Sequence, residues 1–146
     1  MRGRRRVHRL PAAAEPRACA QLLAEPRRRG RARRVLVAEA DGGHLLGTLQ
    51  LALEQPENKP HRADIAKMLV RRAARRRGVG AALLAAAERQ AADAGRTLLV
   101  LDTATEEAAR LYARHGWQLC GTIPNYALLP DGTPCATRVY YKALTP

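Results

Sequence analysis

The stretch from residue 63 to residue 94 constrains the fold of this chain most, because it joins a strand pattern directly to a helix pattern. The apolar run Ala63–Val70 predicts a strand, and the Ala/Leu-rich run Val79–Ala94 has helical spacing. Between them lies the turn Arg75-Arg76-Arg77-Gly78-Val79-Gly80. A helix that begins at such glycines presents unpaired backbone N–H groups and its positive dipole end, so the turn is a candidate phosphate site. The alternative is a glycine turn with solvated arginines; the spacing fits neither a dinucleotide fingerprint nor a P-loop.

Further strands and one more helix are expected along the rest of the chain. Strands are predicted over residues 34–39, 45–53, 97–101, 117–123 and 136–144, a second helix over 106–114, and loops over 54–60 and 124–134. The order of three strands, helix, strand, helix and two strands predicts an α/β chain with a mixed sheet. Trp117 is expected in the core, and so is Cys120, which alternates with apolar neighbours.

Positive charge is concentrated at the start of the chain. The net charge is +13, and residues 1–34 contain twelve arginines and two glutamates, so +10 of it lies there. Three prolines interrupt this segment, and only residues 16–25 have a plausible helix pattern. We therefore predict an Arg-rich segment over residues 1–33, partly disordered or holding one helix, followed by a folded domain over residues 34–146.

Several protein classes are excluded by what the sequence lacks. No run of about 18 apolar residues exists, which argues against a spanning helix and a membrane partner. The Arg-rich start has no apolar signal region, which argues against secretion. The three cysteines are far apart and show no CxxC spacing, so neither a disulfide framework nor a metal site is expected. The cytoplasm is the expected location.

Two motifs resemble those of a known superfamily. The turn at residues 75–80 is similar to the (Arg/Gln)-x-x-Gly-x-(Gly/Ala) motif of the GCN5-related N-acetyltransferase (GNAT) superfamily. Downstream, Ala108-x-x-Leu111-Tyr112-x-x-x-Gly116-Trp117 resembles the superfamily's Ala-x-x-Leu-Tyr-x-x-x-Gly-Phe segment. The resemblance covers residues 34–144, and within it residues 61–70, 101–103 and 126–142 resemble the tabtoxin-resistance acetyltransferase group.

The resemblance implies a GNAT-like fold: a mixed, mostly antiparallel sheet flanked by helices. The superfamily's N-terminal strand and helices are expected to be incomplete here, which would leave a sheet edge unprotected. The implied cofactor is acetyl-coenzyme A, with its pyrophosphate on the start of the first helix and its pantetheine arm along a strand that splays from its neighbour. The implied cofactor-binding residues are Met68, Leu69, Val70, Arg75, Arg76, Arg77, Gly78, Val79, Gly80 and Ala81.

The implied catalytic residues are a proton donor and a proton acceptor. Tyr112 matches the superfamily's tyrosine near the cofactor sulfur and would protonate the departing thiolate; the alternative is a half-buried structural tyrosine. Asp64 is the first candidate for the base, because Ala63-Asp64-Ile65 resembles the Ala-Glu-Ile of histone-type members; the alternative is an exposed strand carboxylate. Asp102, at the end of a buried strand, is the second candidate for the base, and its alternative role is capping of the next helix.

Two further residues are candidates for binding the acceptor. Histidine can accept a proton near neutral pH, and His61 lies close to Asp64 in the sequence; the alternative is a solvated loop histidine. Tyr126 is expected to line the acceptor pocket, although packing on the sheet would explain it equally well.

The function predicted from these residues is transfer of an acetyl group from acetyl-coenzyme A to a primary amine of a small molecule, such as an antibiotic or toxin. One alternative is a protein N-acetyltransferase. Another is a basic nucleic-acid-binding protein without catalysis, but the arginines lack interleaved aromatic residues, so nucleic acid is not an expected partner. The expected partners are acetyl-coenzyme A and the amine, and a homodimer is compatible with the sequence.

Overall fold

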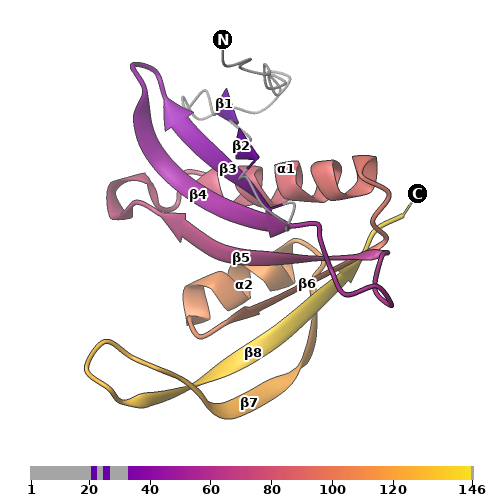
Figure 1. The fold of residues 1–146 in the computed structure, drawn as a ribbon. Coiled ribbons are helices and arrows are strands. Elements are labelled where there is room, and N and C mark those ends of the chain that lie inside the picture. Colours follow the sequence, from indigo (N-terminus) through magenta and orange to yellow (C-terminus); the bar gives the residue numbers. More distant parts are fainter. Residues whose placement is uncertain (1–20, 23–24, 27–32, 146) are drawn as a thin grey trace.

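The computed structural model of the chain describes residues 21–22, 25–26 and 33–145, which form a mixed sheet with two helices (Figure 1). The long strands are β3 (Arg33–Ala40), β4 (His44–Ala52), β5 (Arg62–Val70), β6 (Leu98–Thr103), β7 (Gln118–Leu128) and β8 (Pro134–Ala143). They lie in the order β3-β4-β5-β6-β8-β7, and every neighbouring pair is antiparallel except β5 with β6. The predicted mixed, mostly antiparallel sheet is therefore confirmed.

The helices follow the expected boundaries closely. A short 3-10 turn η1 (Arg72–Ala74) precedes α1 (Val79–Asp93), and α2 (Glu106–Arg114) follows β6. The side chain of Thr105 caps α2 by accepting a hydrogen bond from the Ala108 N–H at 3.2 Å. In the part of the chain that the structure describes, neither helix has the length and apolarity needed to cross a membrane.

The outer edge of β3 is paired, contrary to the expected bare edge. The two-residue strands β1 (Gln21–Leu22) and β2 (Glu25–Pro26) both run antiparallel to β3. At these positions the predicted helix over residues 16–25 is wrong, because pairing with β3 satisfies backbone groups that an open edge leaves without partners. Proline cannot donate to a ladder, so Pro26 suits such an edge strand. The rest of the prediction for residues 1–32 lies outside the described residues.

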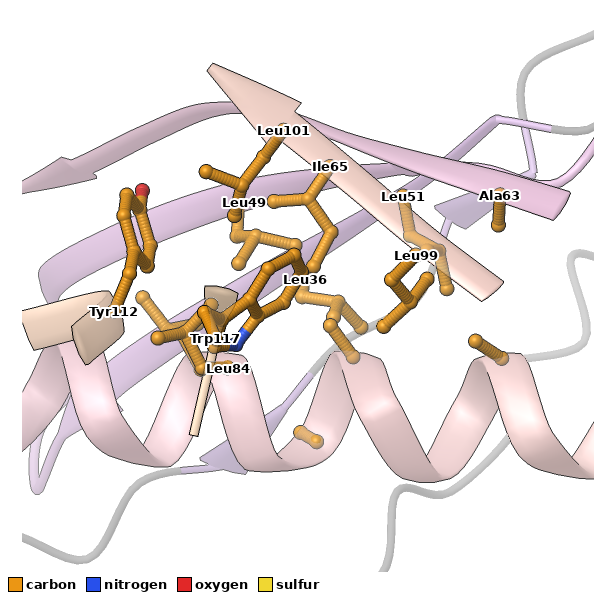
Figure 2. Close-up of a cluster of buried hydrophobic side chains, with 14 of the residues drawn as sticks. Leu36, Leu49, Leu51, Ala63, Ile65, Leu84, Leu99, Leu101, Tyr112 and Trp117 are labelled. Carbon is orange, nitrogen blue, oxygen red and sulfur yellow. The ribbon is translucent and has the colours of Figure 1, made fainter. Parts of the chain in front are cut away.

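The core lies between α1 and one face of the sheet (Figure 2). Side chains in a strand alternate between faces, so β3, β4, β5 and β6 contribute alternate residues to this layer. The largest fully buried side chains are all leucines: Leu36, Leu49, Leu51, Leu83, Leu84 and Leu99. The aromatic members of the core are Tyr112, Trp117 and Tyr140, so the prediction for Trp117 is confirmed.

Strand β7 differs from the sequence prediction in length and burial. It continues to Leu128, and the predicted loop over 124–134 shortens to residues 129–133. A register shift between Ile123 and Ala127 accommodates Pro124, which cannot donate to β8. Cys120, expected to be buried, is exposed, because β7 is the last strand of the sheet and little packs against it.

Shortening one of the fully buried leucines is expected to lower the stability of the fold substantially. Leu99→Ala is expected to lower the free energy of unfolding by about 2–5 kcal/mol, because a fully buried leucine leaves a cavity. Leu45→Ala, at an exposed leucine of β4, is the matched control and should change it by at most about 0.5 kcal/mol. Denaturant titration measures both values; equal losses would show that Leu99 does not belong to the cooperative core.

Candidate active site

The site begins where β5 separates from β6. These parallel strands pair only between Arg62–Asp64 and Leu98–Val100, although β5 continues to Val70. A bulge in β5 adds to the divergence: Ala66 pairs with Gln50 of β4, but the next paired residue is Leu69, and Lys67 takes a positive φ of 50°. The edge of β5 beyond Asp64 therefore faces an open wedge, as the splayed strands of the resemblance imply.

A cavity of about 720 Å³ lies beside the last residues of β5, between the start of α1 and α2. Nine of the ten residues predicted to bind the cofactor line it: Met68, Leu69, Val70, Arg75, Arg76, Gly78, Val79, Gly80 and Ala81. Only Arg77 does not. The opposite wall comes from α2 and includes Glu107, Leu111, Arg114 and His115.

The N-terminus of α1 is suited to a phosphate. Gly78 caps the helix in a left-handed conformation (φ 78°), no side chain caps it, and its first turn contains no acidic residue. The first N–H groups of the helix therefore remain available. A Cβ at Gly80 would lie 2.9 Å from Leu111 Cδ2, so glycine lets α1 approach α2 here. These features fit the pyrophosphate of coenzyme A.

Arg75, in the turn before α1, lines this cavity and contacts two other elements of its wall. Arg75 Nε donates to the carbonyl of Val70 at 3.4 Å, and Arg75 Nη1 lies 3.9 Å from a carboxylate oxygen of Glu107 on α2. These contacts connect the end of β5, the turn before α1 and the first turn of α2. The ion pair is exposed, so its energetic contribution is small and its main effect is orientation.

A second cavity, of about 280 Å³, adjoins the first and shares Met68, Thr105 and Ala108 with it. It lies in the wedge between β5 and β6. Its other walls are Ile65, Ala66 and Lys67 from β5, Asp102, Thr103 and Ala104, Tyr112 from α2, Tyr126 and Ala127 from β7, and Ala136 and Thr137. Three residues predicted for catalysis or acceptor binding thus meet here: Asp102, Tyr112 and Tyr126.

Tyr112 is buried and is held by aromatic packing. Its ring centroid lies 5.8 Å from that of Trp117 and 5.7 Å from that of Tyr140. Burial raises the pKa of Tyr112 to about 12, and the negative charge of Asp102 adds to this effect. The phenol therefore keeps its proton at neutral pH and can act as a donor.

Asp102 is exposed at the end of β6 and accepts a hydrogen bond of 2.8 Å from the hydroxyl of Thr137. Thr105, not Asp102, caps α2. Asp102 therefore does not have the capping role considered above. Asp102 lines the smaller cavity instead.

Asp64 and His61 do not join this group. Asp64 accepts two hydrogen bonds from the guanidinium of Arg62, at 3.0 and 3.2 Å, and lines neither cavity. His61 precedes β5, where its carbonyl accepts the N–H groups of Thr97 and Leu98, and it also lines neither cavity. Both lie at the end of β5 where the sheet is still closed.

Sequence reasoning missed several residues of the two cavities. Thr137 is buried and orients Asp102, but one threonine in a strand carries no signal beyond ordinary β propensity. Lys67 lines the smaller cavity at a bulge that the sequence does not reveal. Arg114 and His115 also line the larger cavity, but basic residues at a helix C-terminus are favourable for their charge alone and so carry no signal of a site.

Comparison with known proteins supports the same fold and family. The profile described as the acetyltransferase (GNAT) family matches residues 5–117. A GNAT-family acetyltransferase from Streptococcus pneumoniae superposes with a TM-score of 0.69 at 23% identity, covering 76% of this chain and 67% of that one. A ribosomal-protein-alanine N-acetyltransferase from Brucella melitensis gives 0.67 at 26% identity, covering 77% and 69%.

A third structure similar to this chain holds a ligand. It is an aminoglycoside 6'-N-acetyltransferase complexed with coenzyme A, with a TM-score of 0.63 and 16% identity, covering 78% of this chain and 74% of that one. At this identity the likeness concerns the fold alone. Because the family profile spans most of the sequence, including both motifs, the chain belongs to the acetyltransferase (GNAT) family.

Proposed function

We propose that this chain is an N-acetyltransferase that moves the acetyl group of acetyl-coenzyme A to a primary amine of a small molecule. The observation that carries the proposal is the junction of the two cavities at Met68, Thr105 and Ala108. One cavity has a helix N-terminus suited to phosphates, and the other has a carboxylate and a buried phenol. Donor and acceptor can therefore meet in one direct transfer, without an acetylated side chain between them.

The larger cavity takes the cofactor. Acetyl-coenzyme A supplies an acetyl group activated as a thioester. The N–H groups of Val79, Gly80 and Ala81 bind the pyrophosphate, and Arg75 and Arg76 add positive charge beside it. The backbone of Met68–Val70, on the open edge of β5, pairs with the pantetheine arm. An amide of this edge faces the thioester oxygen, where negative charge develops during attack.

The smaller cavity takes the amine, and its residues move two protons. Asp102 accepts the proton that the ammonium must lose before attack, and its exposure gives that proton a route to solvent. Tyr112 donates its phenolic proton to the departing sulfur, and the second proton that the nitrogen loses on forming the amide restores the phenol. What supports Asp102 over Asp64 is that Asp102 lines the same cavity as Tyr112, whereas Asp64 is paired with Arg62.

The size of the second cavity favours a small acceptor. About 280 Å³ is close to the lower limit of typical small-molecule pockets. An amine-containing antibiotic or toxin, as in the group that the sequence resembles, is the acceptor class we propose, with Tyr126 on one wall. A protein N-terminus is the alternative acceptor. The names of the similar proteins include both kinds, an aminoglycoside and a ribosomal protein, so they do not separate them.

A screen tests the acetyl transfer itself. The protein is incubated with acetyl-coenzyme A and a panel of small amines and peptides with free N-termini, while free thiol is followed. We expect thiol release with a small amine, together with a cofactor-induced rise in melting temperature. The absence of both effects would refute the proposal, and release only with peptides would move it to protein acetylation.

Gly80→Glu tests the phosphate site. A carboxylate at this position would face the pyrophosphate, so we expect the Kd of coenzyme A to rise at least about 100-fold. Gly80→Gln is the matched control, because it displaces Leu111 equally but adds no charge. Calorimetric titration should show the glutamate variant at least about tenfold weaker than the glutamine variant. Equal Kd values in the two variants would place the phosphates elsewhere.

Tyr112→Phe tests the proton donor. The phenylalanine keeps the packing against Trp117 and Tyr140 but removes the phenolic proton, so kcat should fall about 100-fold while the Kd of coenzyme A stays unchanged. Since the pKa of Tyr112 is about 12, its deprotonation should not lower the wild-type rate below about pH 10. An unchanged kcat in the variant would assign Tyr112 to the core alone.

The two carboxylates can be compared directly. If Asp102 accepts the amine proton, Asp102→Asn should lower kcat about 100-fold and alter the pH dependence of the rate. Asp64→Asn, with the same loss of charge, should leave that pH profile unchanged. The reverse result would assign the base to Asp64.

A further inference from the structure

Lys67 lies in the bulge of β5 and lines the smaller cavity. Two residues of β5 stand between Ala66 and Leu69 where β4 has one, and Lys67 takes a φ of 50° there. A left-handed conformation at a residue other than glycine is strained, so it persists only where the surrounding structure fixes it. In a regular strand, successive side chains point to opposite faces. Residues 65–68 instead all line the same cavity, so the bulge brings a lysine to the acceptor site.

The amine of Lys67 is not engaged in holding the fold together. Lys67 is exposed and takes part in none of the ion pairs between the described residues. Among the described residues that line the smaller cavity, Lys67 is the one with a basic side chain and Asp102 is the one with an acidic side chain. The walls of this cavity thus include a primary amine and the carboxylate assigned above to take a proton from an amine.

Lys67 also lies next to the place where the two cavities meet. Its neighbour Met68 lines both cavities, at the junction where donor and acceptor meet in the proposed transfer. A lysine side chain is a flexible four-carbon stem that ends in a primary amine. A nucleophile tethered beside its electrophile has a high effective concentration, so such an amine competes with amines in solution.

The other lysines of the chain are placed differently. The sequence contains three lysines. Lys142 pairs with Glu88 at 3.1 Å, and Lys59 lies between β4 and β5. Neither of them lines either cavity. Of the three, Lys67 alone lines the acceptor cavity, so the position of an acetylated lysine would report directly on this site.

We propose that Lys67 is a self-acetylation site, which receives the acetyl group of the protein's own bound acetyl-coenzyme A when no external amine fills the smaller cavity. The ammonium of Lys67 first gives a proton to Asp102. The neutral Nζ then forms a bond to the carbonyl carbon, the carbon–sulfur bond breaks, and the sulfur leaves with the proton of Tyr112. The second proton that Nζ loses restores the phenol, and Asp102 releases its proton to solvent. The products are acetyl-lysine and the free thiol of coenzyme A.

Acetylation of Lys67 narrows the acceptor site. It removes the positive charge of the side chain and adds an acetyl group to a residue in the wall of a cavity of about 280 Å³. The modified side chain occupies space that a small amine needs, so the acetylated protein accepts the amine less well. The inference rests on the acetyl transfer proposed above, because it uses the same cofactor and the same two proton-transfer residues.

Mass spectrometry of the full chain tests the modification. The protein is incubated with acetyl-coenzyme A and no acceptor, and the acetylated positions are mapped over time by peptide digestion. We expect acetylation of Lys67 at least about tenfold faster than that of Lys59, which meets the thioester only by collision in solution. Excess coenzyme A should slow acetylation of Lys67, because it fills the larger cavity, and should leave that of Lys59 unchanged.

Lys67→Arg and Lys59→Arg form a matched pair, since each keeps the positive charge and loses one primary amine. The wild type and Lys59→Arg, once fully acetylated by preincubation with acetyl-coenzyme A, should show at least about a tenfold lower kcat/KM for a small amine than before. The same preincubation should leave the kcat/KM of Lys67→Arg where it was.

Three results would overturn the self-acetylation: equal rates at Lys67 and Lys59, no effect of excess coenzyme A, or a rate per molecule that rises in proportion to protein concentration. The first two indicate chemical acetylation, and the third indicates transfer between molecules. Thiol release with a small amine while Lys67 stays unmodified would refute this inference and leave the proposed function standing. If neither Lys67 nor any added amine is acetylated, the proposed function fails as well.

Discussion

The divergence of β5 from β6 is the constraint on which the site depends. Parallel strands hold each other through slanted hydrogen bonds along their whole length, yet here the pairing stops at Asp64. Beyond that point, every backbone N–H and C=O group on the side of β5 that faces β6 needs another partner. On its other side β5 stays paired with β4, and the bulge at Lys67 lets it do so while it turns away from β6. One interruption of the sheet thus produces both a cavity and a strand edge along its wall that is not paired with β6.

Tyr112 connects this opening to the stability of the domain. Its ring packs between Trp117 and Tyr140, which are themselves core residues, so the packing of the core fixes its position. Trp117 in turn donates from Nε1 to Glu88 of α1 at 3.2 Å, and Lys142 of β8 pairs with the same carboxylate at 3.1 Å. The phenol that faces the cavity is therefore held by contacts to α1, β8 and the start of β7. Such support suits the role of proton donor proposed for Tyr112, because a donor acts only from a fixed position.

Local patterns in the sequence were sufficient to predict most of the helices and long strands. The wrong predictions concern properties that depend on pairing between segments far apart in the sequence. The glycines and arginines of residues 75–80 identify the start of α1 because a helix N-terminus has its own local chemistry. The face on which Asp64 lies depends on how β5 pairs with β4, and the exposure of Cys120 depends on β7 being the last strand. Neither property can be inferred from the residues next to it in the sequence. The resemblance to a family supplied what the patterns lacked for the cofactor residues, whereas Thr137 and Lys67 became visible only through the fold.

The distribution of charge follows from the same architecture. Of three consecutive arginines, Arg75 and Arg76 line the larger cavity and Arg77 does not, because the turn into α1 points successive side chains in different directions. Glu107 is the acidic residue that lines that cavity, and its carboxylate lies 3.9 Å from the guanidinium of Arg75. At the opposite edge of the sheet, β7 carries no charge at all. The molecule therefore separates a basic region suited to a polyanion from an uncharged edge strand. The smaller cavity lies between them and is bordered by both.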